Sequence, residues 1–151
     1  MIIGNKSFET GEEPYVMGIL NVTPDSFSDG GQHNTMDTAL ETTEKMIAEG
    51  AVIIDVGGES TRPGYTKISD EEEIWRTAPI IEAIKSRFDV AVSLDTYKSA
   101  VAEAGIHAGA DLINDIWGLK YDDKMAEVIA KYDKSCCLMH NRDNTDYTDY
   151  L

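Results

Sequence analysis

Five short apolar runs, separated by longer amphipathic stretches, constrain the fold of this chain more than any other feature. The runs are too short for helices, rich in Val and Ile, and apolar on both faces. They cover Val16–Leu20, Val52–Val56, Ala91–Leu94, Leu112–Ile113 and Cys136–Met139. Strands with this pattern are typical of parallel sheets that are covered on both faces. The sequence therefore predicts an α/β protein in which strands and helices alternate.

A repeated pattern supports this alternation. Residues 49–55 and 108–114 share the order Gly-Ala-x-x-Ile-(Asp/Asn), and each copy predicts a helix that ends at a glycine and leads into a strand. Before the first copy, four residues fall on one helical face: Met36, Leu40, Thr43 and Ile47. Gly50 follows them, at the position where a glycine ends a helix.

Three further helices are expected. Ser69 and Glu72 have the spacing of a capping box, so we expect the acidic run Asp70–Glu73 to be a solvent-exposed first helical turn, and Pro79 to kink or restart that helix on its way to Arg87. The other two cover Lys98–Ala108 and Lys124–Tyr132, the latter burying Met125, Val128 and Ile129. At the start of the chain, Ile2–Ile3 and Ser7–Glu9 predict a small hairpin.

Each apolar run ends in a polar residue. These residues are Asn21, Asp55, Asp95, Asn114 (with Asp115) and His140. In a parallel barrel the carboxyl ends of all strands open onto one face, where active sites lie. Asp and Asn are also favoured in the turns that follow strands, so a single position says little. Five equivalent positions together favour a functional site.

Two unusual loops belong to the same face. Residues 21–31 and 57–64 are both rich in Gly, Pro and hydroxyl groups, so both can turn sharply and present backbone N–H groups to an anion. Neither matches a P-loop or a dinucleotide-binding fingerprint. Arg62, beside Thr61, adds the charged fork that phosphate prefers. Together the loops predict a clamp for a phosphate-bearing small molecule.

Composition narrows the choice of partner. The chain has 28 acidic and 13 basic residues among 151, a formal charge of −15, which disfavours nucleic acid and anionic membrane surfaces as partners. No apolar run approaches the length of a membrane span, and no leader pattern opens the chain. Cys136 and Cys137 are adjacent in an apolar run, where we expect them to pack separately as small hydrophobes. A cytoplasmic protein is the expectation.

The three histidines do not predict a metal site. His33 and His107 lack a second ligand at metal-binding spacing, and we expect them to be ordinary loop and helix residues. His140, at a strand end, fits a role in a substrate pocket or in the structure better than metal ligation.

Residues 17–31, Met-Gly-Ile-Leu-Asn-Val-Thr-Pro-Asp-Ser-Phe-Ser-Asp-Gly-Gly, resemble the first signature of the dihydropteroate synthase family. Residues 54–64, Ile-Asp-Val-Gly-Gly-Glu-Ser-Thr-Arg-Pro-Gly, resemble its second. Residues 93–97, 112–115 and 138–142 follow in family order, so the resemblance covers essentially the whole chain.

The resemblance implies a fold and an activity. The family fold is a parallel (β/α)8 barrel of TIM-barrel type, of which this chain would be the N-terminal part, preceded by the small β-hairpin. The implied enzyme is a transferase of folate biosynthesis that is typically a homodimer. It condenses 6-hydroxymethyl-7,8-dihydropterin pyrophosphate with 4-aminobenzoate to give 7,8-dihydropteroate and pyrophosphate.

The resemblance also implies roles for individual residues. Asn21 matches the asparagine associated with Mg2+, and Thr61 with Arg62 matches the pyrophosphate contact. The residues that match the pterin pocket or lie near it are Asp95, Asn114, Asp55 and Met139. Phe27 and Pro63 match loop positions that enclose the aminobenzoate. Asp95 and Arg62 are the residues implied in catalysis: Asp95 would hold the pterin, and Arg62 would stabilise charge on the departing pyrophosphate.

The chain also departs from the family pattern. It stops at Leu151, just after the fifth predicted strand, so residues 1–151 would form a single pterin-binding barrel domain that is incomplete at its C-terminus. We expect these residues alone to be poorly active, prone to aggregation, or paired with a second half. Two alternatives stay open: a truncated, non-catalytic pterin-binding chain, and the pterin-binding domain of a methyl-folate methyltransferase.

Overall fold

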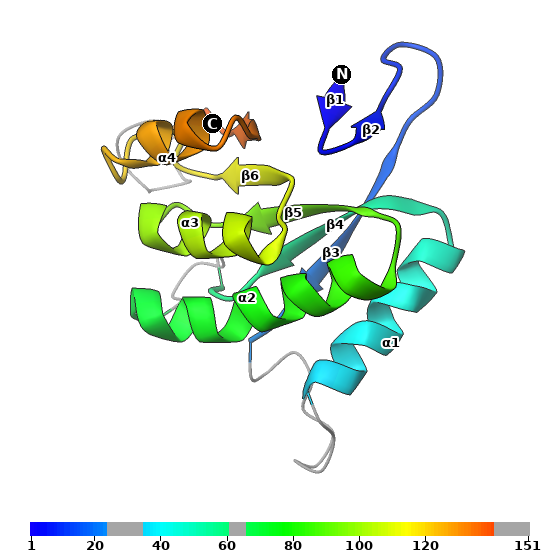
Figure 1. Ribbon diagram of the computed structural model, residues 1–151, viewed down its shortest axis with the longest axis horizontal. Coiled ribbons are helices and arrows are strands. Elements are labelled where there is room, and N and C mark those ends of the chain that lie inside the picture. The colour runs from blue at the N-terminus through cyan, green and yellow to red at the C-terminus, as the bar shows by residue number, and fades with distance from the viewer. Residues whose placement is uncertain (24–34, 61–65, 141–151) are drawn as a thin grey trace, which may run out of the picture.

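The computed structural model describes residues 1–23, 35–60 and 66–140 and forms one parallel sheet, with helices on one side and a hairpin near the strand starts on the other (Figure 1). In chain order the elements are β1 (Ile2–Ile3), β2 (Lys6–Ser7), β3 (Val16–Asn21), α1 (Thr35–Ala48), β4 (Ala51–Gly57), α2 (Asp70–Arg87), β5 (Ala91–Asp95), α3 (Ser99–Ala108), β6 (Leu112–Asp115), α4 (Met125–Lys131) and β7 (Ser135–Leu138).

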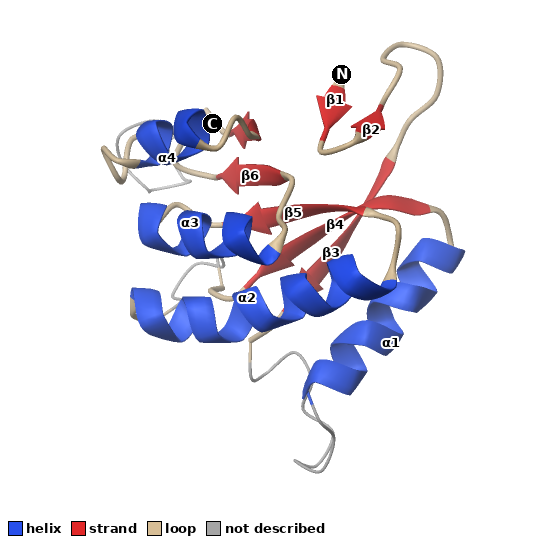
Figure 2. Cartoon of the chain, viewed as in Figure 1, coloured by secondary structure: helices blue, strands red, loops and turns tan. Residues whose placement is uncertain are grey.

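The sheet order is β3-β4-β5-β6-β7, and each neighbouring pair is parallel. Consecutive strands are thus neighbours, and a helix connects each to the next (Figure 2). This is the strand order of a (β/α) barrel. The five predicted strands are confirmed, with bounds that differ by one or two residues.

The outer side of the sheet holds the larger core. Side chains that alternate along the strands, such as Ile54, Val56, Val92 and Leu94, are fully buried against the helices. Helix α2 adds Ile80, Ile81 and Ile84, and helix α3 adds Val101 and Ala102. Strands that are apolar on this side need such a cover, which explains the alternation of strand and helix.

The inner side is closed at one end by the N-terminal hairpin. Ile3 and Phe8 form a second buried cluster with three residues near the starts of the strands: Ile53, Ala91 and Leu112. The Ser135 hydroxyl, at the start of β7, donates to the Ile2 carbonyl. The hairpin therefore packs at the end of the sheet where the strands begin, away from the strand tips (Figure 1).

Helix boundaries follow the expected signals. The Ser69 side chain accepts the Glu72 N–H at 3.1 Å and caps α2. Gly50 and Gly109 both follow helices with φ of 113° and 117°, a conformation that side-chain-bearing residues rarely adopt. The repeated glycine pattern thus marks two helix ends, as predicted.

Three details of the sequence interpretation are wrong, and of the two outcomes expected at Pro79 the restart is excluded. Lys6–Ser7, not Ser7–Glu9, forms the second hairpin strand, because Ile3 pairs with Lys6 across the turn. Helix α2 does not restart at Pro79, since one missing N–H is tolerated within an 18-residue helix packed on the core.

Cys136 and Cys137 are exposed rather than packed, because β7 is an edge strand of the described sheet. In α4, Val128 is only half-buried, whereas Met125 and Ile129 are buried as expected.

Candidate functional site

Three predicted polar residues lie in one row across the inner side of the sheet. Asn21 is in register with Gly57, Gly57 with Asp95, and Asp95 with Asn114. A Cβ on Gly57 would lie 3.6 Å from the Asp95 Cβ and 3.8 Å from the Asn21 Oδ1. The glycine therefore leaves open space between an amide and a carboxylate, at the strand tips where a barrel places its site.

A second polar layer lies one step deeper. Asp55 is in register with Ser93 and two residues before Gly57, so it faces the same side. The Asn114 Nδ2 donates to the Asp55 Oδ2 at 3.5 Å, a long contact that joins the two layers. Both Asp55 and Ser93 are buried, and neither Asp55 Oδ1 nor Ser93 Oγ makes a well-formed hydrogen bond within the described residues, although the Ser93 hydroxyl is close enough to favour the charged Asp55 carboxylate. Unpaired buried polar atoms are costly, so they indicate a site that a polar ligand completes.

Burial raises the pKa of both carboxylates of the site. Burial, together with the negative charges of Asp55, Glu73, Asp115 and Glu59, raises the pKa of Asp95 to about 7. Burial also raises the pKa of Asp55, while the Ser93 and Asn114 side chains oppose this. A ligand that brings several N–H donors to these groups relieves both effects, because it stabilises the ionised carboxylate.

Asp115 does not belong to this site. Its side chain is buried on the outer side of the sheet and accepts the N–H groups of Trp117 and Leu119, both at 2.9 Å. It thereby folds the turn that follows β6. Sequence position alone could not separate Asp115 from Asn114, because both stand at the end of the same apolar run.

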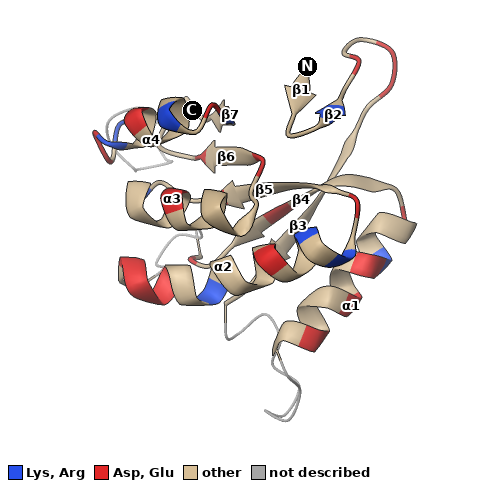
Figure 3. Cartoon of the chain, in the orientation of Figure 1, with Lys and Arg blue, Asp and Glu red and all other residues tan. Residues whose placement is uncertain are grey.

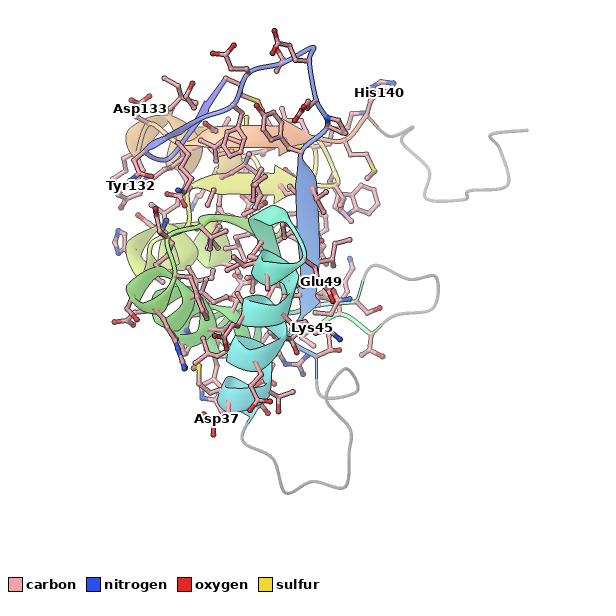
Figure 4. All side chains as sticks on the ribbon, turned by 90° about the vertical axis from the view of Figure 1, so that its right-hand side faces the viewer. Asp37, Lys45, Glu49, Tyr132, Asp133 and His140 are labelled. Atoms are coloured by element: carbon pink, nitrogen blue, oxygen red, sulfur yellow. The ribbon has the colours of Figure 1, made fainter. Side chains whose placement is uncertain are left out.

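The residues after β7 lie at the rim. Met139 is exposed, and its N–H donates to the Asp115 carbonyl at 3.0 Å. Its own carbonyl packs so closely on Gly118 that a Cβ there would clash. His140 is exposed beyond the end of β7, far from the labelled side chains of α1, Asp37 and Lys45 (Figure 4). His107 is an ordinary residue of α3, as expected, and its ring contacts Tyr132.

Four predicted site residues, Phe27, Thr61, Arg62 and Pro63, lie outside the described residues, as does His33. The structure therefore brings together Asn21, Asp55, Asp95 and Asn114, and places Met139 directly after β7, the strand that neighbours β6. The roles that the resemblance implies for all nine residues stay predictions.

A buried ion-pair network beside the site was missed at the sequence level. Lys98 Nζ lies 2.8 Å from Glu59 Oε2 and 2.9 Å from Glu73 Oε1, and all three side chains are at least nine-tenths buried. The expectation that Asp70–Glu73 is solvent-exposed throughout is thus wrong for Glu73, which is 1% exposed. The position of Glu73 in the helix could have predicted its burial, because the fourth residue of a first helical turn can face the sheet while the first two face water.

The surroundings of the site are acidic. Acidic side chains gather in the first turn of α2, which holds Asp70, Glu71, Glu72 and Glu73 (Figure 3). Within the described ranges, no group of three or more His, Cys, Asp or Glu side chains could hold a metal ion. The described helices are also too short or too polar to cross a membrane.

Comparisons with protein families, with known sequences and with solved structures agree with one another. Residues 17–151 match the protein family described as "Pterin binding enzyme". The chain is 63% identical, over all its 151 residues, to a dihydropteroate synthase of Clostridium beijerinckii, of which it covers 56%.

Solved structures agree with the sequence match. A Clostridium difficile dihydropteroate synthase, crystallised in the presence of pteroic acid, superposes with a TM-score of 0.87 at 50% identity, over 93% of this chain and 54% of that one. A Xanthomonas albilineans dihydropteroate synthase with 4-aminobenzoic acid gives a TM-score of 0.84 at 41% identity, over 90% and 50%. The chain thus spans about half the length of these relatives.

Proposed function

Because the chain belongs to the family of pterin-binding enzymes, we propose that its inner strand tips bind a dihydropterin and that the whole protein is a dihydropteroate synthase. The reaction would join 6-hydroxymethyl-7,8-dihydropterin pyrophosphate to 4-aminobenzoate, with release of pyrophosphate. The observation that carries the proposal is the register row of Asn21, Asp95 and Asn114, with Asp55 beneath it.

The chemistry of the pterin ring suits this row. One edge of the ring offers several N–H donors in a plane, and the site supplies carboxylate and amide acceptors close together. Asp95 would accept donors from the ring edge, and Asn114 would accept one and donate to a ring atom. Asp55 Oδ1 and Ser93 Oγ, which lack well-formed hydrogen bonds, lie one layer deeper, where donors and acceptors of the ring edge would bind them. A ligand that lacks these groups would leave buried polar atoms unpaired, which gives the site its discrimination.

The bond that breaks joins the pterin methylene carbon to a pyrophosphate oxygen. The leaving group departs with the bonding electrons, so negative charge grows on it and positive charge on the carbon. The aminobenzoate nitrogen then attacks that carbon and loses a proton, so the protein need not supply a nucleophile. The residues that would stabilise the departing charge, Thr61 and Arg62, carry hydroxyl and guanidinium donors suited to phosphate.

Asn21 fits the proposed Mg2+. It is exposed at the tip of β3 and offers one amide oxygen next to the open space above Gly57. Mg2+ keeps several waters and is held by few protein oxygens together with substrate phosphates, so a single amide ligand is compatible with it. The chemistry that a bound Mg2+ supplies is neutralisation of the charge on the pyrophosphate.

The test is turnover by the whole protein. Purified protein is mixed with dihydropterin pyrophosphate, 4-aminobenzoate and Mg2+, and dihydropteroate is measured by chromatography. We expect product that depends on both substrates and on Mg2+, and loss of at least about 100-fold in kcat/KM for Arg62→Ala. Pterin binding without product would indicate the non-catalytic alternative. Tight binding of a methyl-folate, with no use of the pyrophosphate substrate, would indicate the methyltransferase alternative.

We further propose a cytoplasmic homodimer, as the family resemblance implies. Light scattering on the whole protein tests the assembly: a mass twice that of the protomer is expected, and a monomeric mass would contradict it.

A further inference from the structure

The ion-pair network of Glu59, Lys98 and Glu73 joins three parts of the chain. Glu59 follows β4, Glu73 lies in the first turn of α2, and Lys98 lies three residues after Asp95. Two hydroxyl groups that neighbour Lys98 in the sequence add to the network. The Thr96 hydroxyl donates to Glu73 Oε2 at 2.6 Å, and the Tyr97 hydroxyl donates to Glu59. The segment that follows β5 is therefore tied to both carboxylates.

The network closes the connection between β4 and α2. Glu59 Oε2 accepts the Ile68 N–H at 3.1 Å, so two residues nine positions apart are joined directly. Lys98 binds both of them, since its amine contacts the Glu59 carboxylate and donates to the Ile68 carbonyl, each at 2.8 Å. Thr61 and Arg62 fall between these anchored ends in the sequence.

A further contact fixes the start of the same connection. The Arg76 side chain donates to the Gly58 carbonyl at 3.0 Å and pairs with Glu72 one helical turn before it. Gly58 is thereby tied to α2, directly before Glu59. The connection is thus held at its start by α2 and across its two ends by Lys98.

The Lys98 amine is held by groups of the protein itself. It donates to Glu59 and to the Ile68 carbonyl, and it forms an ion pair with the Glu73 carboxylate at 2.9 Å. Its side chain is 8% exposed. Lys98 therefore acts on a ligand only through the groups that it holds in place.

Charge favours the ionised forms of Glu59 and Lys98 in the network, whereas burial prevails at Glu73 and raises its pKa. Burial alone would raise the pKa of Glu59, but its hydrogen bonds with Lys98 and Tyr97 outweigh burial and lower that pKa. Burial alone would likewise lower the pKa of Lys98, but Glu59 and Glu73 favour its charged form and raise that pKa. Without the lysine, the two buried carboxylates would repel each other. Removing one partner of such a network strongly destabilises its local arrangement.

We infer that Glu59 and Lys98 are positioning residues for the diphosphate end of the substrate, an inference that rests on the proposed function. They hold the ends of the β4–α2 connection against the segment that follows Asp95. In the proposed function the pterin end binds at the strand tips, whose backbone the sheet hydrogen bonds hold without the network. Loss of the network therefore weakens recognition of the diphosphate and spares recognition of the ring.

The experiment compares two ligands by calorimetry on the whole protein. One is 6-hydroxymethyl-7,8-dihydropterin pyrophosphate with Mg2+, and the other is the same pterin without the diphosphate. For Lys98→Met and Glu59→Gln we expect the Kd of the first ligand to rise at least about tenfold and that of the second to change less than about threefold. Glu59→Gln keeps the shape of the side chain, so its two Kd values test the inference if Lys98→Met does not fold.

Matched controls come from an exposed ion pair. Lys131 and Glu103 lie 3.2 Å apart between α4 and α3, with side chains 65% and 39% exposed. Lys131→Met and Glu103→Gln make the same chemical changes there, and we expect them to leave both Kd values unchanged. An equal loss for both ligands in the network variants, or no loss for either, would overturn the inference. Failure of the unaltered protein to bind either ligand would instead overturn the proposed function, and this inference with it.

Discussion

Burial is shared by acidic residues of the site and by others: Asp55 is buried in the site, whereas Asp115 is buried in the turn that follows β6. Asp55 is 5% exposed and Glu73 is 1% exposed, in a chain whose 28 acidic residues look alike in the sequence. The sequence predicted Asp55, Asp95 and Asn114 because they end apolar runs. It could not predict that Lys98 would bind Glu59 and Glu73, because that pairing depends on how three connections pack over the sheet.

The raised pKa of Asp95 predicts a pH-dependent cost to stability. The pKa is about 7 in the folded protein, against an ordinary value of 3.8, so between these values the folded protein binds the proton more tightly than the unfolded chain. The contribution of Asp95 to stability is therefore most favourable at low pH and is lost as pH rises from about 4 to 7. Replacing Asp95 with Asn removes this loss, and we expect the free energy of unfolding at pH 8 to rise by about 1–3 kcal/mol.

Denaturant unfolding of the whole protein at pH 8 and pH 4 measures the effect. The gain should be present at pH 8 and small at pH 4, where the folded protein carries Asp95 in its neutral form. A variant that is less stable than the unaltered protein at pH 8 would show that Asp95 is not held in an unfavourable charged state.

At the scale of elements, the strands and most helix ends were predictable because their signals are local. Val and Ile runs predict strands, and Ser69, Gly50 and Gly109 mark helix ends through their own backbone chemistry. The exposure of Cys136 and Cys137 was not predictable, because it depends on which neighbours cover the last strand of the described sheet.

The packing of α3 on the sheet gives a prediction at this scale. A Cβ on Gly105 would lie 2.2 Å from the Cδ2 of Leu94, a fully buried side chain. We expect Gly105→Ala to lower the free energy of unfolding by about 1–3 kcal/mol, because Leu94 must leave its place in the core. Thermal unfolding measures it.

Gly57→Ala is the matched comparison. Its Cβ would meet Asp95 and Asn21 only at ordinary contact distances of 3.6–3.8 Å. We expect little loss of stability, but weaker pterin binding, because the methyl group fills the space between the two side chains. Equal stability losses in the two glycine variants would contradict this difference.

Across the whole molecule, one end of the sheet carries the candidate site and the other end carries a packed apolar cluster. The strand tips carry Asn21, Asp95 and Asn114, whereas the strand starts are closed by Ile3 and Phe8 of the N-terminal segment. In parallel barrels the tips carry function and the opposite end carries stability. The sequence predicted the hairpin, but not that it would pack on the inner side near the strand starts, because that packing depends on contacts between residues far apart in the chain.

Phe8→Ala tests this separation. Phe8 is 3% exposed, and we expect its truncation to lower the free energy of unfolding by about 3–5 kcal/mol. The Kd for dihydropterin, measured at a temperature where the variant is folded, should stay within about twofold of the unaltered value. A large loss of pterin affinity in the folded variant would show that the two ends are coupled.

The most direct test of the central claim, that the inner strand tips bind a dihydropterin, is calorimetric titration of the whole protein with 6-hydroxymethyl-7,8-dihydropterin pyrophosphate at pH 8. Asp95→Ala and Asn114→Ala should each weaken binding by at least about 100-fold, because each leaves polar groups of the ring unpaired in a buried site. Glu103→Gln, on the exposed face of α3, should bind as the unaltered protein does. Unchanged affinity in Asp95→Ala would contradict the assignment of the pterin site to these strand tips.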